Sequence, residues 1–297
     1  MIESARVENV SVVIPARNAA PFLGDCLRSV LAQSYPPAEV VVVDDGSEDG
    51  TADVARSFGG RVRVLTNPGR GVASALNFGI ESARFGLIAH FDADDLMRPN
   101  KLARQIPLFA PHRASSLGFV GSDLLMFDEY GPDDATFLDR RPGLRRAHPP
   151  GLVDGVIRLS PAQARRALCR EYCVDIKGVY PKWVWEEVGG FDTSMRCVND
   201  MDFVWRVAGR YGVAVVDEVL IDGRRHANNM SRDDRLVAEE CLTLFRRMLA
   251  SGLPEEDRLV VRERIAREHY DLAHIHRKAA RYPRCLLSYL KYALRVA

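Results

Sequence analysis

Hydrophobic residues in the first 120 positions fall into short β-branched runs, separated by longer segments in which apolar residues recur every three or four positions. The short runs predict strands and the longer segments predict helices. The expected strands cover residues 10–14, 40–43, 61–65 and 87–91, and the expected helices cover residues 20–33, 50–58, 71–84 and 100–109. This alternation is typical of a parallel sheet covered by crossover helices.

The pattern is less regular in the rest of the chain. An apolar segment at residues 118–120 leads into residues 128–150, which are rich in Pro, Gly, Asp and Arg and which we expect to form a long mobile loop. The next expected elements are a helix at 161–170, an apolar segment at 176–180, a helix at 181–188, a turn at 189–192, a helix at 200–211 and a strand at 213–216. Helical periodicity then continues from residue 232, with breaks near 252–254 and 282–283. We therefore expect an α/β domain over residues 1–231 and a helical region over residues 232–297.

The composition is that of an ordinary globular protein and narrows the function only slightly. The chain has 297 residues, of which 47% are hydrophobic, enough to bury a substantial core. A formal net charge of +1 argues against a dedicated nucleic-acid binder. The six cysteines form no Cys-x-x-Cys pair, so neither a zinc site nor a disulfide framework is favoured.

The sequence gives two indications about location. No apolar run approaches the roughly 18 to 20 residues that span a bilayer, and the first residues do not resemble a secretory signal, so we expect a cytoplasmic protein. Residues 284–297 combine an apolar stripe with flanking cations, which suits either the closing helix of a bundle or peripheral contact with the inner face of an anionic membrane. The bundle is the favoured alternative, and membrane contact through the basic C-terminal helices stays open.

Acidic residues gather where the fourth expected strand ends. Asp92, Asp94 and Asp95 place three carboxylates within four residues. Repulsion within such a cluster is relieved by a divalent cation, and oxygen ligands suit Mg²⁺ or Mn²⁺. The alternative is structural, because Asp95 can cap a helix that begins near Pro99. This run alone does not decide between a metal site and a helix cap.

Polar residues also follow the first two expected strands. The first strand leads into Pro15-Ala16-Arg17-Asn18, and the second ends in Asp44-Asp45, followed by Gly46 and Ser47. Ligands of open α/β sheets bind outside the carboxyl ends of the strands, where these acceptors and this tight turn could hold a base and a ribose. The structural alternative is that Ser47 or Asp49 only starts the following helix.

Several motifs occur in one order along the chain and together are more specific than any part. They are Ser11 to Asn18, Asp44-Asp45-Gly46-Ser47, Asn67-x-Gly69, Leu76-Asn77-x-Gly79-Ile80, Phe91-Asp92-Ala93-Asp94-Asp95, Gly189-Gly190-Phe191-Asp192, Asn199-Asp200-x-Asp202 and Arg225-His226. This set resembles the family 2 glycosyltransferases, inverting enzymes of the GT-A fold, over roughly three quarters of the chain. The resemblance implies an α/β fold with a Rossmann-like, mostly parallel sheet flanked by helices, to which the helical periodicity after residue 231 adds a C-terminal helical appendix. It divides the α/β domain into a donor half, residues 1–125, and an acceptor half, residues 126–231.

The resemblance also implies roles for individual residues. The nucleotide-sugar donor is expected to contact Pro15, Ala16, Arg17, Asn18, Asp44, Asp45, Arg70, Asp92 and Asp94. Asp45 corresponds to a position that accepts a hydrogen bond from a uracil-type N–H. The divalent metal, Mn²⁺ or Mg²⁺, is expected to bind Asp94, Asp95 and His226. Asp200 corresponds to the general base, which takes the proton of the acceptor hydroxyl.

Three features put parts of that resemblance in doubt or leave them open. Most relatives have Glu where this chain has Asn199, and many have Arg where it has Leu76, so those contacts are absent or supplied from elsewhere.

Trp183 and Trp185 follow the segment that forms the acceptor side in relatives. Aromatic faces stack on sugar rings, but large aromatics more often pack in the core, and at most one of the two is expected to reach a sugar.

The sequence thus predicts an inverting hexosyl- or N-acetylhexosaminyltransferase. Its donor is expected to be UDP-linked, and its acceptor a hydroxyl of a glycan, lipid-linked or small molecule in cell-envelope polysaccharide synthesis. A sugar-1-phosphate nucleotidyltransferase would carry a Gly-rich loop after the first strand, where residues 15–20 contain no glycine. A receiver module would carry its acid pair after the first strand and not the second. A non-catalytic nucleotide-sugar binder stays open, although Asp94, Asp95 and Asp200 together argue against it. The oligomeric state is not indicated.

Overall fold

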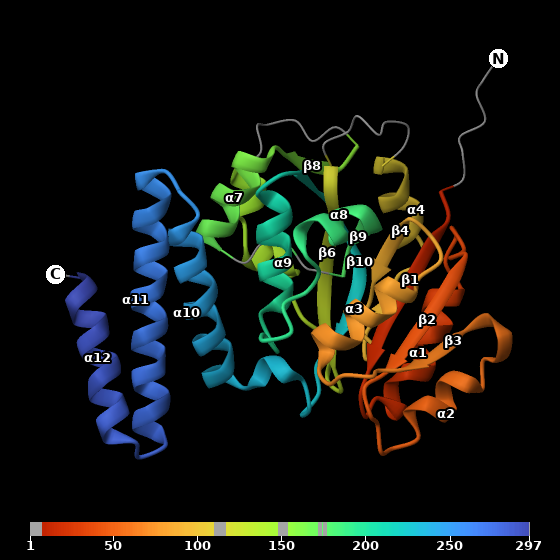
Figure 1. Cartoon of the computed structure of the whole chain (residues 1–297), viewed down its shortest axis with the longest axis horizontal. Helices are drawn as coiled ribbons and strands as arrows, with labels where there is room; N and C mark the ends of the chain where they lie inside the picture. Colours follow the sequence, from red (N-terminus) through yellow and green to blue (C-terminus); the bar gives the residue numbers. More distant parts are fainter. Residues whose placement is uncertain (1–7, 110–116, 148–153, 172–173, 175–176, 297) are drawn as a thin grey trace.

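The computed structural model describes residues 8–109, 117–147, 154–171, 174 and 177–296. Within these residues a ten-stranded sheet forms the centre of the molecule, with helices packed around it (Figure 1). Eight strands follow the order β3-β2-β1-β4-β9-β6-β10-β5 across the sheet. The short strands β7 and β8 pair with β6 and β10 beside this path.

The N-terminal half alternates strands and helices as the hydrophobic pattern predicts. Its elements are β1 (Val10–Ala16), α1 (Ala20–Leu31), β2 (Glu39–Asp44), α2 (Thr51–Arg56), β3 (Arg63–Thr66), α3 (Val72–Ser82) and β4 (Leu87–His90). β1 lies between β2 and β4 and is parallel to both, and β2 is parallel to β3. The loops that follow these strands therefore meet at one edge of the sheet.

The second half completes a mixed sheet. Its elements are β5 (Leu96–Met97), α4 (Lys101–Gln105), β6 (Leu117–Asp128), β7 (Gly131–Pro132), α5 (Phe137–Arg140), α6 (Gly143–Ala147), β8 (Val156–Leu159), α7 (Pro161–Arg170), β9 (Val179–Pro181), α8 (Lys182–Val188), α9 (Asn199–Ala208) and β10 (Gly212–Arg224). β9 runs antiparallel to both β4 and β6. β10 is parallel to β6 and antiparallel to β5 and β8.

The prediction of one long loop over residues 128–150 was wrong. That stretch contains β7, α5 and α6, and Leu138 and Leu144 are buried in the core. A capping box between Thr136 and Asp139 starts α5, a signal that the abundance of Pro, Gly and Asp concealed. Residues 148–150 of that expected loop, and Ile176 of the next expected segment, lie outside the described residues.

Alternation along β1 assigns the two faces of the sheet. Val12 and Ile14 pack with Leu23 of α1 and Leu102 of α4, whereas Val13 packs in a second cluster with α3, α8 and α9. Successive side chains of a strand point to opposite faces, so both faces of β1 are covered. The hydrophobic run that predicted a buried strand is explained by this double burial.

Three helices complete the chain, with breaks where the sequence predicted them. They are α10 (Asp234–Ala250), α11 (Glu255–Lys278) and α12 (Tyr282–Val296), and they lie side by side at the left of Figure 1, away from β3. Leu242 and Phe245 of α10 belong to the same hydrophobic cluster as α9. No helix among the described residues is long and apolar enough to cross a membrane.

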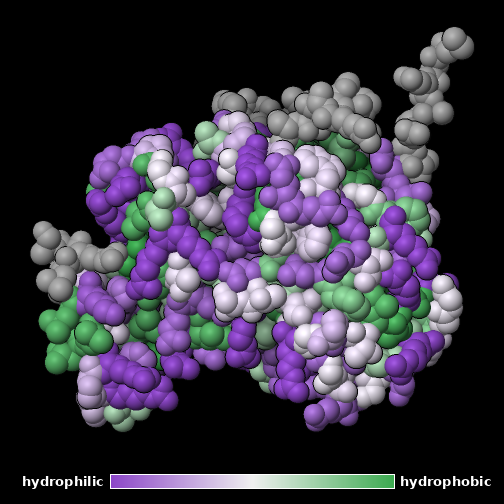
Figure 2. Space-filling model, viewed as in Figure 1, coloured by the Kyte–Doolittle hydropathy of each residue, from purple (hydrophilic) through white to green (hydrophobic). Residues whose placement is uncertain are grey.

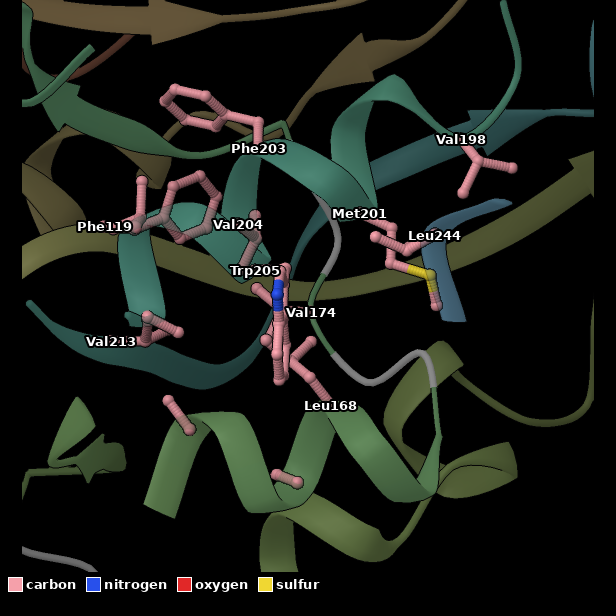
Figure 3. Packing of buried hydrophobic residues seen from close by; sticks show 14 of the residues in the cluster. Phe119, Leu168, Val174, Val198, Met201, Phe203, Val204, Trp205, Val213 and Leu244 are labelled. Carbon is pink, nitrogen blue, oxygen red and sulfur yellow. The ribbon is translucent and has the colours of Figure 1, made fainter. Parts of the chain in front are cut away.

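Helix α9 is buried over most of its surface. Figure 3 shows Met201 of α9 beside Leu244 of α10, and Trp205 of α9 above Leu168 of α7. Val204, between them, is fully buried. Contacts with both α7 and α10 therefore fix the position of α9, and with it the acidic residues of its first turn.

Candidate active site

The loops after β1 and β2 are fastened to each other. Asn18 has a left-handed backbone, with φ of 49°; its N–H donates to Ser47 Oγ (3.0 Å), and its Oδ1 accepts from Glu48 N–H (2.9 Å). Asp49 accepts from the N–H of Ala20 (3.0 Å) and from that of Thr51 (3.1 Å), the first residues of α1 and α2. Asp49 therefore contacts the starts of both α1 and α2, whereas Ser47 bonds to Asn18 and does not cap α2, whose N-cap is Gly50.

Asp45 is a buried acceptor at this edge of the sheet. Its carboxylate, 8% exposed, accepts from Asn67 Nδ2 (2.7 Å) and from the N–H of Gly71 (2.9 and 3.0 Å). Arg17 Nη1 lies 3.9 Å from the same carboxylate. The structure thus brings Arg17 and Asp45 together beside Asp44, whereas the side chain of Arg70 is exposed.

Asp92, Asp94 and Asp95 converge in the loop after β4. One carboxylate oxygen of each lies within 4.8 Å of the others. Burial, together with the charges of Asp92 and Asp94, raises the pKa of Asp95 to about 7 against the opposing charge of Lys177. Oxygen donors crowded in this way are the ligands that Mg²⁺ and Mn²⁺ prefer, and a cation relieves their repulsion. The triad therefore fits a divalent metal.

Lys177 lies beside the triad and was missed by sequence reasoning. Its Nζ is 3.1 Å from Asp95 Oδ2 and 3.5 Å from Asp92 Oδ2, and its side chain is 11% exposed. Burial would raise the pKa of Asp92, but Lys177 and His90 lower it below its usual value. The neighbour of Lys177, Gly178, accepts a hydrogen bond from His90 N–H (3.2 Å). Only the pairing of β9 with β4 brings Lys177 here, and no local motif reports that pairing.

The segment after β10 closes onto the triad from the other side. His226 Nε2 lies 2.9 Å from Asp94 Oδ2, and Asn229 Nδ2 donates to the same oxygen (3.3 Å). The N–H of Arg224 donates to Asp95 Oδ1 (2.7 Å). Of the predicted metal ligands Asp94, Asp95 and His226, the two aspartates lie with Asp92 in the acidic triad, and His226 contacts the triad through Asp94. Arg224 and Asn229 also contact the triad.

Two neighbours orient this segment. Phe22 of α1 stacks on the His226 ring with centroids 4.5 Å apart, and Arg224 Nε donates to the carbonyl oxygen of Asp94 (3.0 Å). Arg225, in contrast, pairs with Asp128 and Asp133 (3.3 and 2.9 Å). A cavity of about 340 Å³ adjoins the site, and it is lined by Met126, Arg225, Asn229, Arg232 and Asp234.

Cys26 of α1 contacts the backbone of the acidic loop. Its Sγ lies 3.3 Å from the carbonyl oxygen of Asp92, and burial raises the pKa of the thiol well above its usual value. The cysteines that the structure describes are free thiols.

Asp200 lies in the first turn of α9, one position past its first residue, and not at the N-cap, which is Val198. Its Oδ1 accepts from the N–H of Met201 (2.7 Å), and the side chain is half-buried. Asn199 is buried, and its Nδ2 donates to the carbonyl oxygens of Met195 and Arg196 (3.4 and 3.3 Å). Asn199 therefore supports the preceding turn.

Glu240 of α10 holds the turn that leads into α9. It is 8% exposed and accepts from three consecutive N–H groups, those of Arg196 (2.8 Å), Cys197 (2.8 Å) and Val198 (3.0 Å). A carboxylate near a helix N-terminus accepts hydrogen bonds from backbone N–H groups that lack a partner, and its negative charge interacts favourably with the positive end of the helix dipole. The sequence could not reveal this contact, because the two partners are more than 40 residues apart.

The other acids of the acceptor-half motifs form a structural ion-pair network. Arg247 Nη1 lies 2.7 Å from Asp192 and 3.0 Å from Asp202, and Arg206 Nε also pairs with Asp202 (2.8 Å). Burial would raise the pKa of Asp192, but hydrogen bonds from Ser194 and the charge of Arg247 lower it to about 2. These two acids therefore tie α9 to α10.

Asn77 of α3 ties the Gly-Gly-Phe-Asp turn to the donor half. Its Oδ1 accepts from Phe191 N–H (2.8 Å) and from Trp185 Nε1 (3.2 Å), and its Nδ2 donates to the Phe191 carbonyl oxygen (2.8 Å). Trp185 is thus held in the fold. Trp183 is 48% exposed and meets Tyr211 edge to face, so it is the one of the pair available to a ligand.

Comparison with known proteins identifies a family match and several similar sequences. Residues 11–172 match the family model described as glycosyl transferase family 2. An uncharacterized glycosyltransferase of Rickettsia felis is 26% identical over 265 residues, which cover 83% of this chain and 39% of that protein. The putative teichuronic acid biosynthesis glycosyltransferase TuaG of Bacillus subtilis is 35% identical over 141 residues, 44% of this chain and 56% of that protein. The chain spans about two fifths of the length of the first of these relatives.

Two solved structures share the fold. S. aureus TarS 1-349 in complex with UDP-GlcNAc aligns with a TM-score of 0.67 and 14% identity, over 97% of this chain and 82% of that one. The mannosyltransferase PcManGT from Pyrobaculum calidifontis, in complex with GDP-Man and Mn²⁺, aligns with a TM-score of 0.61 and 19% identity, over 96% and 75%. Sequence identities of 14% and 19% show that the fold is shared, and they show nothing about which ligand this chain binds.

Proposed function

The chain belongs to glycosyltransferase family 2 and has the GT-A fold, and on this basis we propose that it transfers a sugar from a UDP-linked donor to an acceptor hydroxyl, with inversion. The observation that carries the proposal is the convergence of Asp92, Asp94 and Asp95 with His226. This group lies at the edge of the sheet that also presents Asp45, so one nucleoside diphosphate could reach both.

The donor is proposed to bind across the ends of β1, β2 and β4. Asp45, fixed by Asn67 and Gly71, presents a rigid carboxylate suited to accept the N–H of uracil, and the loop from Pro15 to Asn18 forms the adjoining wall. The UDP assignment is supported by the complex of TarS with UDP-GlcNAc, whereas PcManGT binds GDP-Man. A hexosyl or N-acetylhexosaminyl donor is proposed on the same ground.

The diphosphate is proposed to lie against the acidic triad. Asp94, Asp95 and His226 would hold Mn²⁺ or Mg²⁺, which when bound supplies positive charge to the leaving diphosphate. Lys177 and Arg224 contribute cationic groups of the chain at the same place. These side chains lie between β4, β9 and β10, so the site forms only in the folded sheet.

Asp200 is proposed as the general base. It takes the proton of the acceptor hydroxyl as that oxygen bonds to the anomeric carbon, while the bond from that carbon to the phosphate oxygen breaks and its electron pair leaves with the diphosphate. Attack opposite the leaving group gives a β-linkage from an α-linked donor. A glycan or lipid-linked acceptor of the cell envelope is supported by the name of TuaG, and the cytoplasmic location stays a prediction.

Calorimetric titration with UDP, GDP, TDP and CDP, with and without Mn²⁺, tests the donor half. We expect UDP to bind in a Mn²⁺-dependent manner, and Asp94→Asn to weaken this binding at least tenfold because it removes a charged ligand. Asp200→Asn should bind UDP like the wild type but lose about 10²-fold or more in turnover of the UDP-sugar. Absence of binding by all four nucleotides would refute the proposal, and equal turnover in Asp200→Asn would refute the assigned base.

A further inference from the structure

Helix α12 leaves a row of leucines uncovered. Leu286, Leu287 and Leu290 are 63%, 52% and 51% exposed, and their spacing places them on one side of the helix. Figure 2 shows hydrophobic side chains gathered at the left edge of the molecule, where α12 lies in Figure 1. Three neighbouring large apolar side chains left in water are unusual enough to indicate a contact surface.

The opposite side of α12 is already occupied. Cys285 and Ser288 are buried, and the rings of Tyr289 and Tyr292 contact Tyr270 of α11 (centroids 6.1 and 5.4 Å apart). The helix thus closes the bundle with one side, as the sequence favoured. The leucine row is left over from that packing, so the two alternatives raised by the sequence are compatible.

The stretch of chain that contains the leucine row carries charge of one sign. Residues 272–297 contain no Asp or Glu and six Lys or Arg: Arg277, Lys278, Arg281, Arg284, Lys291 and Arg295. Arg284 and Lys291 are exposed, and on a helical wheel they adjoin the side that carries Leu287. An apolar row bordered by cations is the pattern of helices that lie in the interface of an anionic bilayer.

We propose that α12 docks on the surface of a membrane with anionic lipids, the leucines entering the interface and the cations contacting headgroups. A second copy of the chain fits less well, because a symmetric contact of this face would oppose cations to cations with no acid in the stretch to pair them. The proposal does not rest on the proposed sugar transfer. It would bring the chain to a surface where lipid-linked acceptors lie.

Co-sedimentation with lipid vesicles tests this proposal. The full chain should bind vesicles of phosphatidylcholine with about one third phosphatidylglycerol, and should not bind phosphatidylcholine alone. Leu286→Gln with Leu290→Gln should reduce binding at least tenfold, because the buried apolar area is lost. Arg284→Gln with Lys291→Gln should reduce it by roughly fivefold per cation removed at low salt.

Matched controls distinguish vesicle binding through α12 from nonspecific binding by other exposed residues. Arg56→Gln with Arg61→Gln removes the same charge from exposed positions near α2, and Tyr130→Gln removes an apolar side chain that is 89% exposed; both should bind like the wild type. Circular dichroism checks that each variant is folded. The proposal is overturned by absence of binding to anionic vesicles or by equal losses in the controls. It is also overturned by a wild-type dimer in analytical ultracentrifugation that the leucine variant dissociates.

Discussion

The three carboxylates after β4 receive their partners from distant stretches of the chain. Lys177 approaches Asp92 and Asp95 from the segment before β9, and His226 and Arg224 approach Asp94 and Asp95 from the end of β10. Burial and the charges of Asp92 and Asp94 raise the pKa of Asp95 to about 7, whereas the charge of Lys177 and the hydrogen bond from the Arg224 N–H act in the opposite direction. Lys177 thus supplies in the fold some of the positive charge that a divalent ion would supply.

Replacing Lys177 by Met removes that charge and nearly keeps the length of the side chain. Because Nζ no longer neutralises Asp92 and Asp95, we expect the affinity for Mn²⁺ in the absence of nucleotide to rise roughly tenfold. Without metal the thermal midpoint should fall, since the carboxylates repel each other, and Mn²⁺ should restore it. Calorimetry and thermal melting, each with and without Mn²⁺, measure both effects.

Lys278→Met is the matched control for Lys177, because Lys278 is exposed on α11 and the substitution changes the net charge equally. It should leave the Mn²⁺ affinity unchanged. An unaltered affinity in Lys177→Met as well would show that Lys177 does not compete with metal for the triad.

Single residues were predictable where a local motif reports them. Asp92, Asp94 and Asp95 follow a recognisable strand, and the family resemblance implied that His226 lies near Asp94, as the structure shows. Lys177 was not predictable, because its place depends on a three-residue strand, β9, pairing antiparallel with β4. Such pairings are set by the packing of the whole sheet and leave little trace in a short sequence window.

At the scale of elements, the turn that leads into α9 depends on Glu240 of α10. The three N–H groups before α9 have no capping side chain of their own and donate to Glu240. Asp200, proposed as the base, stands two residues after the last of these donors. Glu240 is therefore a positioning residue in our proposal, since it fixes the turn from which Asp200 projects.

Glu240→Gln keeps the shape of the side chain, but it removes the charge and turns an amide donor toward a backbone N–H. We expect a loss of about 1–2 kcal/mol in the free energy of unfolding, measured by urea denaturation. If the turn positions Asp200, kcat should fall several-fold while KM for the donor stays unchanged.

Glu239→Gln serves as control for Glu240, because Glu239 is the exposed neighbour that pairs with Arg235. It should change both stability and kcat little. A Glu240→Gln variant that is less stable but has wild-type kcat would assign Glu240 a structural role only.

Elements were predictable to the degree that their burial is regular. β1, β2 and β4 were predicted because they are buried on both faces, and α1 and α3 because each buries one side. β3 was also predicted, although it lies at the end of the strand order and is only partly buried. β6 and β10 have 12 and 13 residues, although only three or four residues of each were predicted. The second half of each strand contains polar residues. Asp123 of β6 accepts from the N–H of Leu138, and Asp222 of β10 pairs with the guanidinium of Arg98. A pattern based on hydrophobicity ends at such residues.

At the scale of the whole molecule, the boundary expected at residue 231 crosses a shared core. Phe245 and Met248 of α10 lie in the same cluster as Phe203 of α9 and Tyr180 of β9. Arg247 adds ion pairs from α10 to Asp192 and Asp202. We therefore expect α10 to unfold together with the α/β part, and not as part of an independent helical domain.

Arg247→Met tests this expectation, because it leaves Asp192 and Asp202 with one cation fewer at the contact between α10 and the sheet. Arg247 is 43% exposed, so we expect a loss of about 1–2 kcal/mol and not the larger loss found for fully buried pairs. All three tryptophans lie between residues 183 and 205, so their fluorescence reports the α/β part, whereas far-ultraviolet circular dichroism also reports α10 to α12. In urea the two signals should change together, and both should shift to lower urea in Arg247→Met but not in Arg246→Met, an exposed neighbour. The opposite result would be a dichroism signal that changes at lower urea than the fluorescence, with only the dichroism transition shifted in Arg247→Met. In that case α10 to α12 would unfold as a separate unit, and the ion pairs of Arg247 would not join them to the sheet.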